Sequence, residues 1–151
     1  MTSKNNYLIL KEYNKCLTLI ENMLGNTTTN NLQLEALGKH LFNNRFLGIY
    51  SANTFPKYVK NNYMFIINTD PISKPGQHWI ACYKFNNKFY MYDTFNRNIK
   101  DLSKYWKHKT NIVSANKDID QSIVEENRGQ RALSWLVLAD KFKPNKIMYV
   151  I

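Results

Sequence analysis

The sequence has 151 residues, which is the usual size of one compact domain and leaves no room for a second. A hydrophobic content of 44% and an aromatic content of 14% exclude a disordered chain. The net charge of +10 favours polyanionic partners such as nucleic acid. A drift of the composition toward Asn and Lys would give the same charge without any such function.

The two cysteines, Cys16 and Cys82, are too few for a disulfide framework and form no Cys-x-x-Cys pair. We therefore expect no metal site and a reducing compartment. The N-terminus lacks the long apolar segment of a secretion signal, and no apolar stretch approaches the ~20 residues of a membrane span. The expected location is intracellular, with no membrane partner.

Two helices are predicted in the N-terminal part of the chain. Residues 4–24 place apolar side chains at mostly helical spacings, and Gly25 followed by Asn26 supplies a stop. Residues 32–42 repeat apolar side chains at positions 34, 37 and 41, which indicates a second helix. His40 falls in this helix and is expected on the surface rather than in a catalytic site.

The remainder of the chain alternates β-rich runs with Pro, Gly and Asn turn signals. Strands are predicted at residues 46–51, 63–68, 78–85, 88–95 and 147–151. Residues 131–142 are apolar on all sides, which is typical of a helix buried in a core. We therefore expect an α+β fold with an antiparallel-rich sheet packed on a buried central helix.

The Asn86-Asn87 pair lies between two aromatic-rich runs and predicts a two-residue hairpin turn, because asparagine tolerates positive φ. Pairing residue 85 with 88 puts 80 opposite 93 and 78 opposite 95. His78 and Asp93 then become diagonal neighbours on one face, with Cβ atoms ~7–8 Å apart. Such a pair forms either a structural hydrogen bond or the base and orienting acid of a catalytic triad.

Three segments, residues 67–83, 90–97 and 121–136, carry Gly-x-His-Trp, Tyr-Asp-Thr-Phe, a glutamine, and a Gly-Gln-Arg that heads a tryptophan-containing helix. With these motifs the chain resembles the adenovirus-type (adenain-like) cysteine proteases, which have a papain-like fold. It is most similar to the short versions found in Maverick/Polinton-type elements and large DNA viruses. The resemblance runs from residue 27 to residue 151 and leaves residues 1–26 as an additional helix on a single domain.

The resemblance implies a role for each matching residue. His78 is the general base, Asp93 is the acid that orients it, and Gln121 is the oxyanion-hole glutamine. The family's nucleophilic cysteine stands directly before Gly-Gln-Arg, at the position of Arg128 in this sequence.

Arg128 removes the nucleophile, because a guanidinium is always protonated and has no lone pair with which to attack a carbonyl. It also places a cation at a helix N-terminus, which is unfavourable by about 0.3–1 kcal/mol. We expect Asp93, Glu125, Glu126 or a bound phosphate to compensate its charge. An Asp93–Arg128 pair would turn the former acid into a structural partner.

Other potential nucleophiles are poorly placed. Cys82 is four residues along the strand from His78, about 13 Å away at ~3.3 Å per residue, and Cys16 lies outside the recognised region. Ser122 and Ser134 lack the position at a helix start that activates the family's nucleophile.

Trp79, Gly129 and Gln130 are expected to bind substrate, although a tight turn and a helix start explain the last two equally simply. The first functional reading is an inactive pseudoprotease that binds peptide or DNA, and the second is an active maturation protease with a Cys-to-Arg change. The third is a basic nucleic-acid-binding structural protein. No cofactor is required, although the resemblance allows DNA as an activating polyanion, and it implies an infected cell or a virion as the location.

Overall fold

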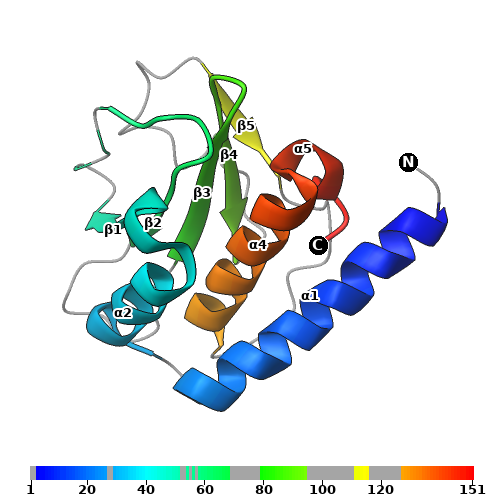
Figure 1. The fold of residues 1–151 in the computed structure, drawn as a ribbon, viewed down its shortest axis with the longest axis horizontal. Coiled ribbons are helices and arrows are strands. Elements are labelled where there is room, and N and C mark those ends of the chain that lie inside the picture. The colour runs from blue at the N-terminus through cyan, green and yellow to red at the C-terminus, as the bar shows by residue number, and fades with distance from the viewer. Residues whose placement is uncertain are drawn as a thin grey trace.

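The chain folds as an α+β structure in which helices cover one face of a five-stranded sheet (Figure 1). The computed structural model describes residues 3–26, 29–51, 54, 56, 58–68, 79–94, 111–115 and 127–151. The helices are α1 (Ser3–Leu24), α2 (Asn31–Phe42), α4 (Arg128–Phe142) and α5 (Pro144–Ile147), with a 3₁₀ turn, η1, at Asn43–Arg45. The strands are β1 (Phe46–Ser51), β2 (Met64–Asn68), β3 (Trp79–Phe85), β4 (Lys88–Asp93) and β5 (Ile112–Ser114).

The sheet is mixed, and the expectation of an antiparallel-rich sheet was therefore only half right. Its strands follow the order β1-β2-β3-β4-β5. The two central pairings, β2 with β3 and β3 with β4, are antiparallel, whereas β1–β2 and β4–β5 are parallel. The short strand β5 was not predicted, because three residues are too few to show an alternating pattern.

Helix α4 is the central helix of the fold, as predicted. It contacts α1, α2 and α5 and packs on β3 and β4. Most of its side chains are buried, including Leu133, Trp135 and Leu136 with no exposed surface. The helix begins at Arg128, three residues before the predicted start at 131. Its polar first turn has no apolar repeat by which the sequence would reveal it.

The two faces of the sheet belong to different parts of the core. One face, with Met64, Ala81 and Tyr92, packs with α1, α2 and α4 in the larger cluster. The opposite face carries a second cluster made of Val59, Phe65, Ile67, Ile80, Cys82, Phe89 and Met91. Because side chains alternate along a strand, odd-numbered and even-numbered residues of one strand lie on opposite faces of the sheet.

The predicted strand at 147–151 is wrong, because residues 144–147 form helix α5 and residues 148–150 form turns. Pro144 occupies the start of α5, where its fixed φ suits a helix and its missing N–H costs nothing. Tyr149 has a φ of 62°, which an extended strand does not allow. The aromatic and β-branched composition of this segment therefore predicted the wrong element.

A partly exposed network of hydrogen bonds ties the C-terminal half of α4 to η1 and the sheet. The two terminal guanidinium nitrogens of Arg45 donate to the Asp140 carboxylate at 2.8 and 2.7 Å. Tyr83 Oη donates to the same carboxylate at 2.7 Å. Arg45 also donates to the Asn62 carbonyl at 3.0 Å. The hydrogen bonds from Arg45 are the main cause that lowers the pKa of Asp140 below its usual value. The network keeps residues 95 positions apart in fixed contact.

Candidate active site

The β3–β4 hairpin has the turn and the register counted from the sequence. Asn86 and Asn87 take φ values of 51° and 64°, the left-handed pair that a two-residue hairpin turn requires. Phe85 pairs with Lys88, and Ile80 pairs with Asp93. His78 and residue 95 lie outside the described residues, so their pairing stays a prediction.

Asp93 is the last residue of β4 and has no exposed surface. It lies opposite Ile80, and strand alternation places its side chain on the sheet face that carries Cys82 and Met91, away from α4. A carboxylate so far from water needs a hydrogen-bonding or charged partner, because the desolvation of an unpaired charge is prohibitive. Its burial fits a carboxylate that orients another side chain rather than one that meets solvent.

Thr94 fixes the backbone next to the predicted base. Its N–H donates to the Trp79 carbonyl at 3.3 Å, and its hydroxyl donates to the same carbonyl at 3.0 Å. The start of β3 is thereby held against the end of β4. This double contact constrains the peptide between Trp79 and Ile80, and the sequence pattern alone gave no sign of it.

Arg128 is the first residue of α4 and is half-buried. The residue before it, Asn127, makes no side-chain capping hydrogen bond, and the first turn contains no acidic residue. A thiolate at this position would gain from the helix dipole, whereas the guanidinium opposes it. The position predicted for the nucleophile is thus a helix N-terminus, as that role requires, while the side chain there is a cation.

Arg131 joins the first turn of α4 to the end of β4. Its guanidinium donates to the Thr94 carbonyl and to Tyr92 Oη, each at 3.4 Å. These two acceptors flank Asp93, so Arg128 and Asp93 lie on elements that are tied together. The expected Asp93–Arg128 pair itself stays a prediction. Arg131 is half-buried and connects the two elements.

Aromatic side chains support this junction from the helix side. The Tyr92 ring stacks on Trp135 of α4, with centroids 5.6 Å apart and an interplanar angle of 4°. Tyr13 of α1 is buried beside Tyr92 and Arg131, and burial is the main cause that raises the pKa of both tyrosines. The N-terminal helix thus reaches the junction between α4 and β4, a role that sequence reasoning did not assign to it.

The three residues expected to bind substrate are buried. Trp79 is 1% exposed and Gln130 has no exposed surface. The Gln130 amide nitrogen donates to the Gly25 carbonyl at 2.8 Å and so holds the end of α1. A Cβ on Gly129 would lie 2.7 Å from Thr29 Cγ2, so that glycine allows close packing of α4 against the start of α2. Each residue has a structural role, and its contact with substrate stays a prediction.

Two of the alternative nucleophiles, Cys82 and Ser134, are buried. Burial raises the pKa of the Cys82 thiol well above its usual value. The thiol donates to the Ile80 carbonyl of its own strand. Burial also raises the pKa of Cys16, on α1. Ser134 is buried and donates to the Gln130 carbonyl within α4. Ser122, Gln121, Glu125 and Glu126 lie outside the described residues.

The described ranges hold neither a metal-ligand cluster nor a membrane-spanning helix. No group of three or more His, Cys, Asp or Glu side chains there comes together as a metal site. None of the helices in those ranges is both long and apolar enough to cross a bilayer. His40 is exposed on α2, as predicted.

Comparison with known proteins identified one family. A family model described as adenovirus endoprotease matches residues 46–136, which is well over half of the chain. The match begins with β1, ends within α4, and includes positions 78, 93, 121 and 128. Neither the curated proteins nor the solved structures contain a significant match to the chain.

Proposed function

Because the chain belongs to the adenovirus endoprotease family, we propose that it is a pseudoprotease, a single papain-like domain that binds peptides without cleaving them. The proposal extends the family relationship to the short proteins of Maverick/Polinton-type elements and large DNA viruses. Residues 1–26 supply an additional N-terminal helix. The proposed location is the infected cell or the virion.

The observation that carries the proposal is Arg128 at the start of α4. In a cysteine protease this position holds a thiolate, whose lone pair attacks the substrate carbonyl. A guanidinium stays protonated and cannot form the thioester intermediate. Arginine at this position therefore blocks the first chemical step.

The remaining catalytic set is proposed to be intact. His78 would act as the base, Asp93 would orient it, and Gln121 would donate to an oxyanion. Support for this comes from the hairpin register, the burial of Asp93, and the Thr94 clamp on the Trp79 carbonyl. A parent protein with cysteine at position 128 would be an active maturation protease. We propose a recent loss of activity, since the other catalytic residues remain in the sequence.

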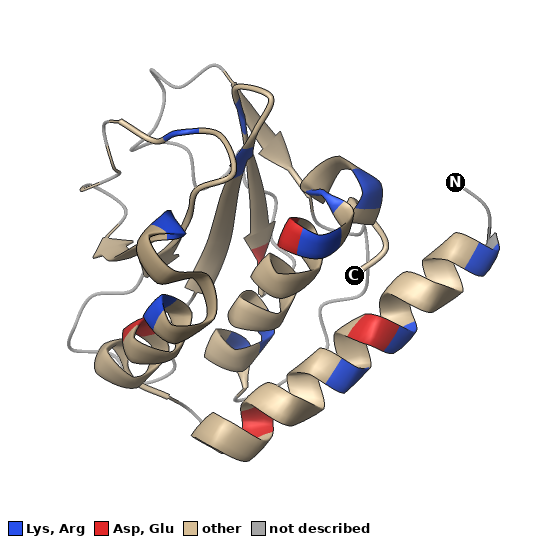
Figure 2. Ribbon diagram, viewed as in Figure 1, with Lys and Arg blue, Asp and Glu red and all other residues tan. Residues whose placement is uncertain are grey.

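Nucleic-acid binding is a second candidate, favoured by the net charge of +10. Lys and Arg are distributed over α1, α2, α4 and α5 rather than along one element (Figure 2). Such a distribution suits nonspecific attraction to a polyanion, including DNA as an activator, and not sequence readout. The affinity for a DNA duplex should fall steeply between 50 and 200 mM salt. The slope of log affinity against log salt concentration should be roughly proportional to the number of phosphates neutralised. An affinity that is unchanged over that range would refute this role.

The proposal is tested by exposing the unmodified chain to a mixed peptide library. We expect a subset of peptides to be retained and recovered uncut, because the proposal keeps peptide binding and lacks a nucleophile. Cleavage that an alkylating reagent abolishes would show an active thiol and overturn the proposal. Retention of no peptide by a folded sample would overturn the binding role.

A further inference from the structure

A pocket lies at the opposite end of α4 from the candidate active site. Its volume is about 600 Å³, and its lining comes from α1, α4 and α5: Asn5, Leu8, Ile9, Phe142, Asn145 and Lys146. Phe142 is roughly 21 Å from Arg128, at 1.5 Å per residue along the helix. The volume falls within the ~300–1,000 Å³ range of ligand sites. The pocket is therefore a separate candidate site.

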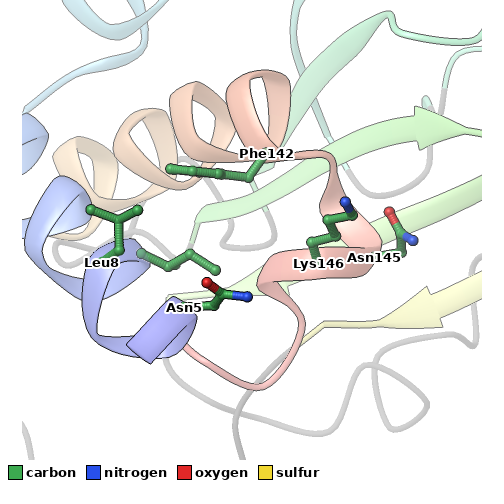
Figure 3. Close-up of a pocket in the computed structure, with 6 residues that line it drawn as sticks. Asn5, Leu8, Phe142, Asn145 and Lys146 are labelled. Atoms are coloured by element: carbon green, nitrogen blue, oxygen red, sulfur yellow. The ribbon is translucent and has the colours of Figure 1, made fainter. Parts of the chain in front are cut away.

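The pocket combines an apolar floor with a polar rim (Figure 3). Leu8 of α1 and Phe142 at the end of α4 lie on its apolar side, and Ile9, a buried core residue, also lines it. Asn145 and Lys146 project from α5 on one side, and both are exposed. None of the six lining residues in the described part of the chain is acidic. An apolar group would be held by the floor, and an anion would be attracted to the rim.

The charges around the rim favour an anion. Glu12 of α1 and Asp140 of α4, the acidic residues of these two helices closest in sequence to the lining residues, are already engaged. Asp140 accepts two hydrogen bonds from Arg45, and Glu12 pairs with Lys141 at 3.2 Å. Lys143 precedes α5 and adds a further positive charge to the segment that carries the rim. The electrostatic complement of the pocket mouth is therefore an anionic group, such as a carboxylate.

The backbone holds the rim in a defined position. Lys143 and Tyr149, on either side of α5, both have positive φ values, 75° and 62°. Such conformations are unfavourable for residues other than glycine and persist only where the surrounding structure imposes them. Here the buried side chains of Pro144 and Ile147 anchor the short helix between them. Asn145 and Lys146 are thus presented by a fixed corner rather than by a free terminus.

We propose that this pocket binds a short peptide segment in which an apolar residue stands beside an acidic residue. The apolar side chain enters between Leu8 and Phe142, and the carboxylate pairs with Lys146. The amide of Asn145 offers both a donor and an acceptor, which match the C=O and N–H of a peptide bond. An alkyl carboxylate would use the floor and the lysine but would leave the asparagine unused. The proposal does not depend on the chemistry at position 128.

The test is a fluorescence-polarisation titration with a labelled, amidated peptide, Glu-Leu-Phe-Glu. Control peptides replace its acidic residues by lysine or its apolar residues by glycine. We expect Lys146→Glu to weaken binding about tenfold or more, as expected for the loss of one favourable charge contact and its replacement by a repulsive one. Lys39→Glu, on the exposed surface of α2, is the matched control and should leave affinity unchanged. Leu8→Gln should also weaken binding, and because Leu8 is 48% exposed the variant should fold normally.

Restoration of affinity by pairing Lys146→Glu with the lysine-containing peptide would confirm the charge contact. Equal binding of all three peptides would overturn the proposal, as would unchanged affinity in both pocket variants. Binding of decanoate with no binding of the acidic peptide would assign the pocket to alkyl carboxylates instead. Circular-dichroism melting of each variant separates loss of the pocket from loss of the fold. Activity at position 128 does not enter any of these measurements, so failure here leaves the pseudoprotease proposal intact.

Discussion

Gly129, the glycine that follows the nucleophile position, is predicted to be required for packing. A Cβ at this position would lie 2.7 Å from Thr29 Cγ2 and 3.3 and 3.4 Å from the two methyl groups of Leu34. Carbon atoms in ordinary contact are about 3.5–4.0 Å apart. Overpacking of this kind costs ~1–3 kcal/mol, and alanine regains at most ~1 kcal/mol in helix propensity. We expect Gly129→Ala to lower the free energy of unfolding by about 1 kcal/mol, which is roughly 2–4 °C in Tm.

The contact with Thr29 provides the control. Thr29→Ser removes Cγ2 and keeps the hydroxyl that donates to Gln33 Oε1 at 3.1 Å. In the Thr29→Ser background, Gly129→Ala should be neutral or stabilising, so the double-mutant cycle should show a coupling of about 1–2 kcal/mol. Urea unfolding followed by circular dichroism gives all four free energies. Equal destabilisation in both backgrounds would refute the steric argument, and so would stabilisation by Gly129→Ala in the wild-type background.

Two further predictions concern groups whose pKa values the fold shifts. Asp140→Asn should cost about 1–2 kcal/mol at pH 7, because it removes charge-assisted hydrogen bonds from Arg45 and weakens that from Tyr83. The pKa of Asp140 is lowered on folding, so this stability is present above the unfolded pKa of about 3.9 and is lost as pH falls through the lower, folded pKa. If the difference in free energy of unfolding between wild type and variant instead grows on acidification, the argument is wrong. Cys82 should resist alkylation until the protein unfolds, because its thiol is buried and its pKa is raised; modification in native buffer at the rate of a free thiol, located by peptide mass mapping against Cys16, would be the contrary result.

The parts of the fold that could be predicted from sequence are those set by local chemistry. The Asn86-Asn87 turn determined the register of its hairpin, because a two-residue loop allows only one pairing. Helix α1 and the apolar part of α4 were equally evident from their spacing. Asp93 could be placed on its face of the sheet for the same reason. The turn and the strand period were therefore enough to place Asp93 in the sheet without knowledge of the fold.

The parts that could not be predicted depend on contacts between distant segments. The parallel pairings of β1 with β2 and of β4 with β5 leave no mark on the sequence period. Gly48 lies at an irregularity in β1 with a φ of 127°, where a Cβ would lie 2.5 Å from Glu35 Oε1. The positive φ at this irregularity, which pattern alone does not reveal, favours glycine there. Arg131 likewise looks like a surface charge until β4 is placed beside it.

The contribution of α1 to the candidate site also depends on tertiary contacts. The family match begins at residue 46, so α1 lies outside it. In the structure, α1 packs along α4. The Gly25 carbonyl at its end is held by Gln130, and Tyr13 is buried beside Arg131. The helix therefore belongs to the scaffold that supports the start of α4.

The most direct test of the central claim is the rate of thiol-dependent peptide cleavage by the Arg128→Cys variant and by the unmodified chain, each with and without DNA. The account predicts no cleavage by the unmodified chain and measurable cleavage by the variant, because the proposed set of nucleophile, base and oxyanion donor lacks only the nucleophile. His78→Ala in the Arg128→Cys background is the control and should abolish the new activity. Cleavage by the unmodified chain, or the absence of cleavage by a folded Arg128→Cys variant, would contradict the account.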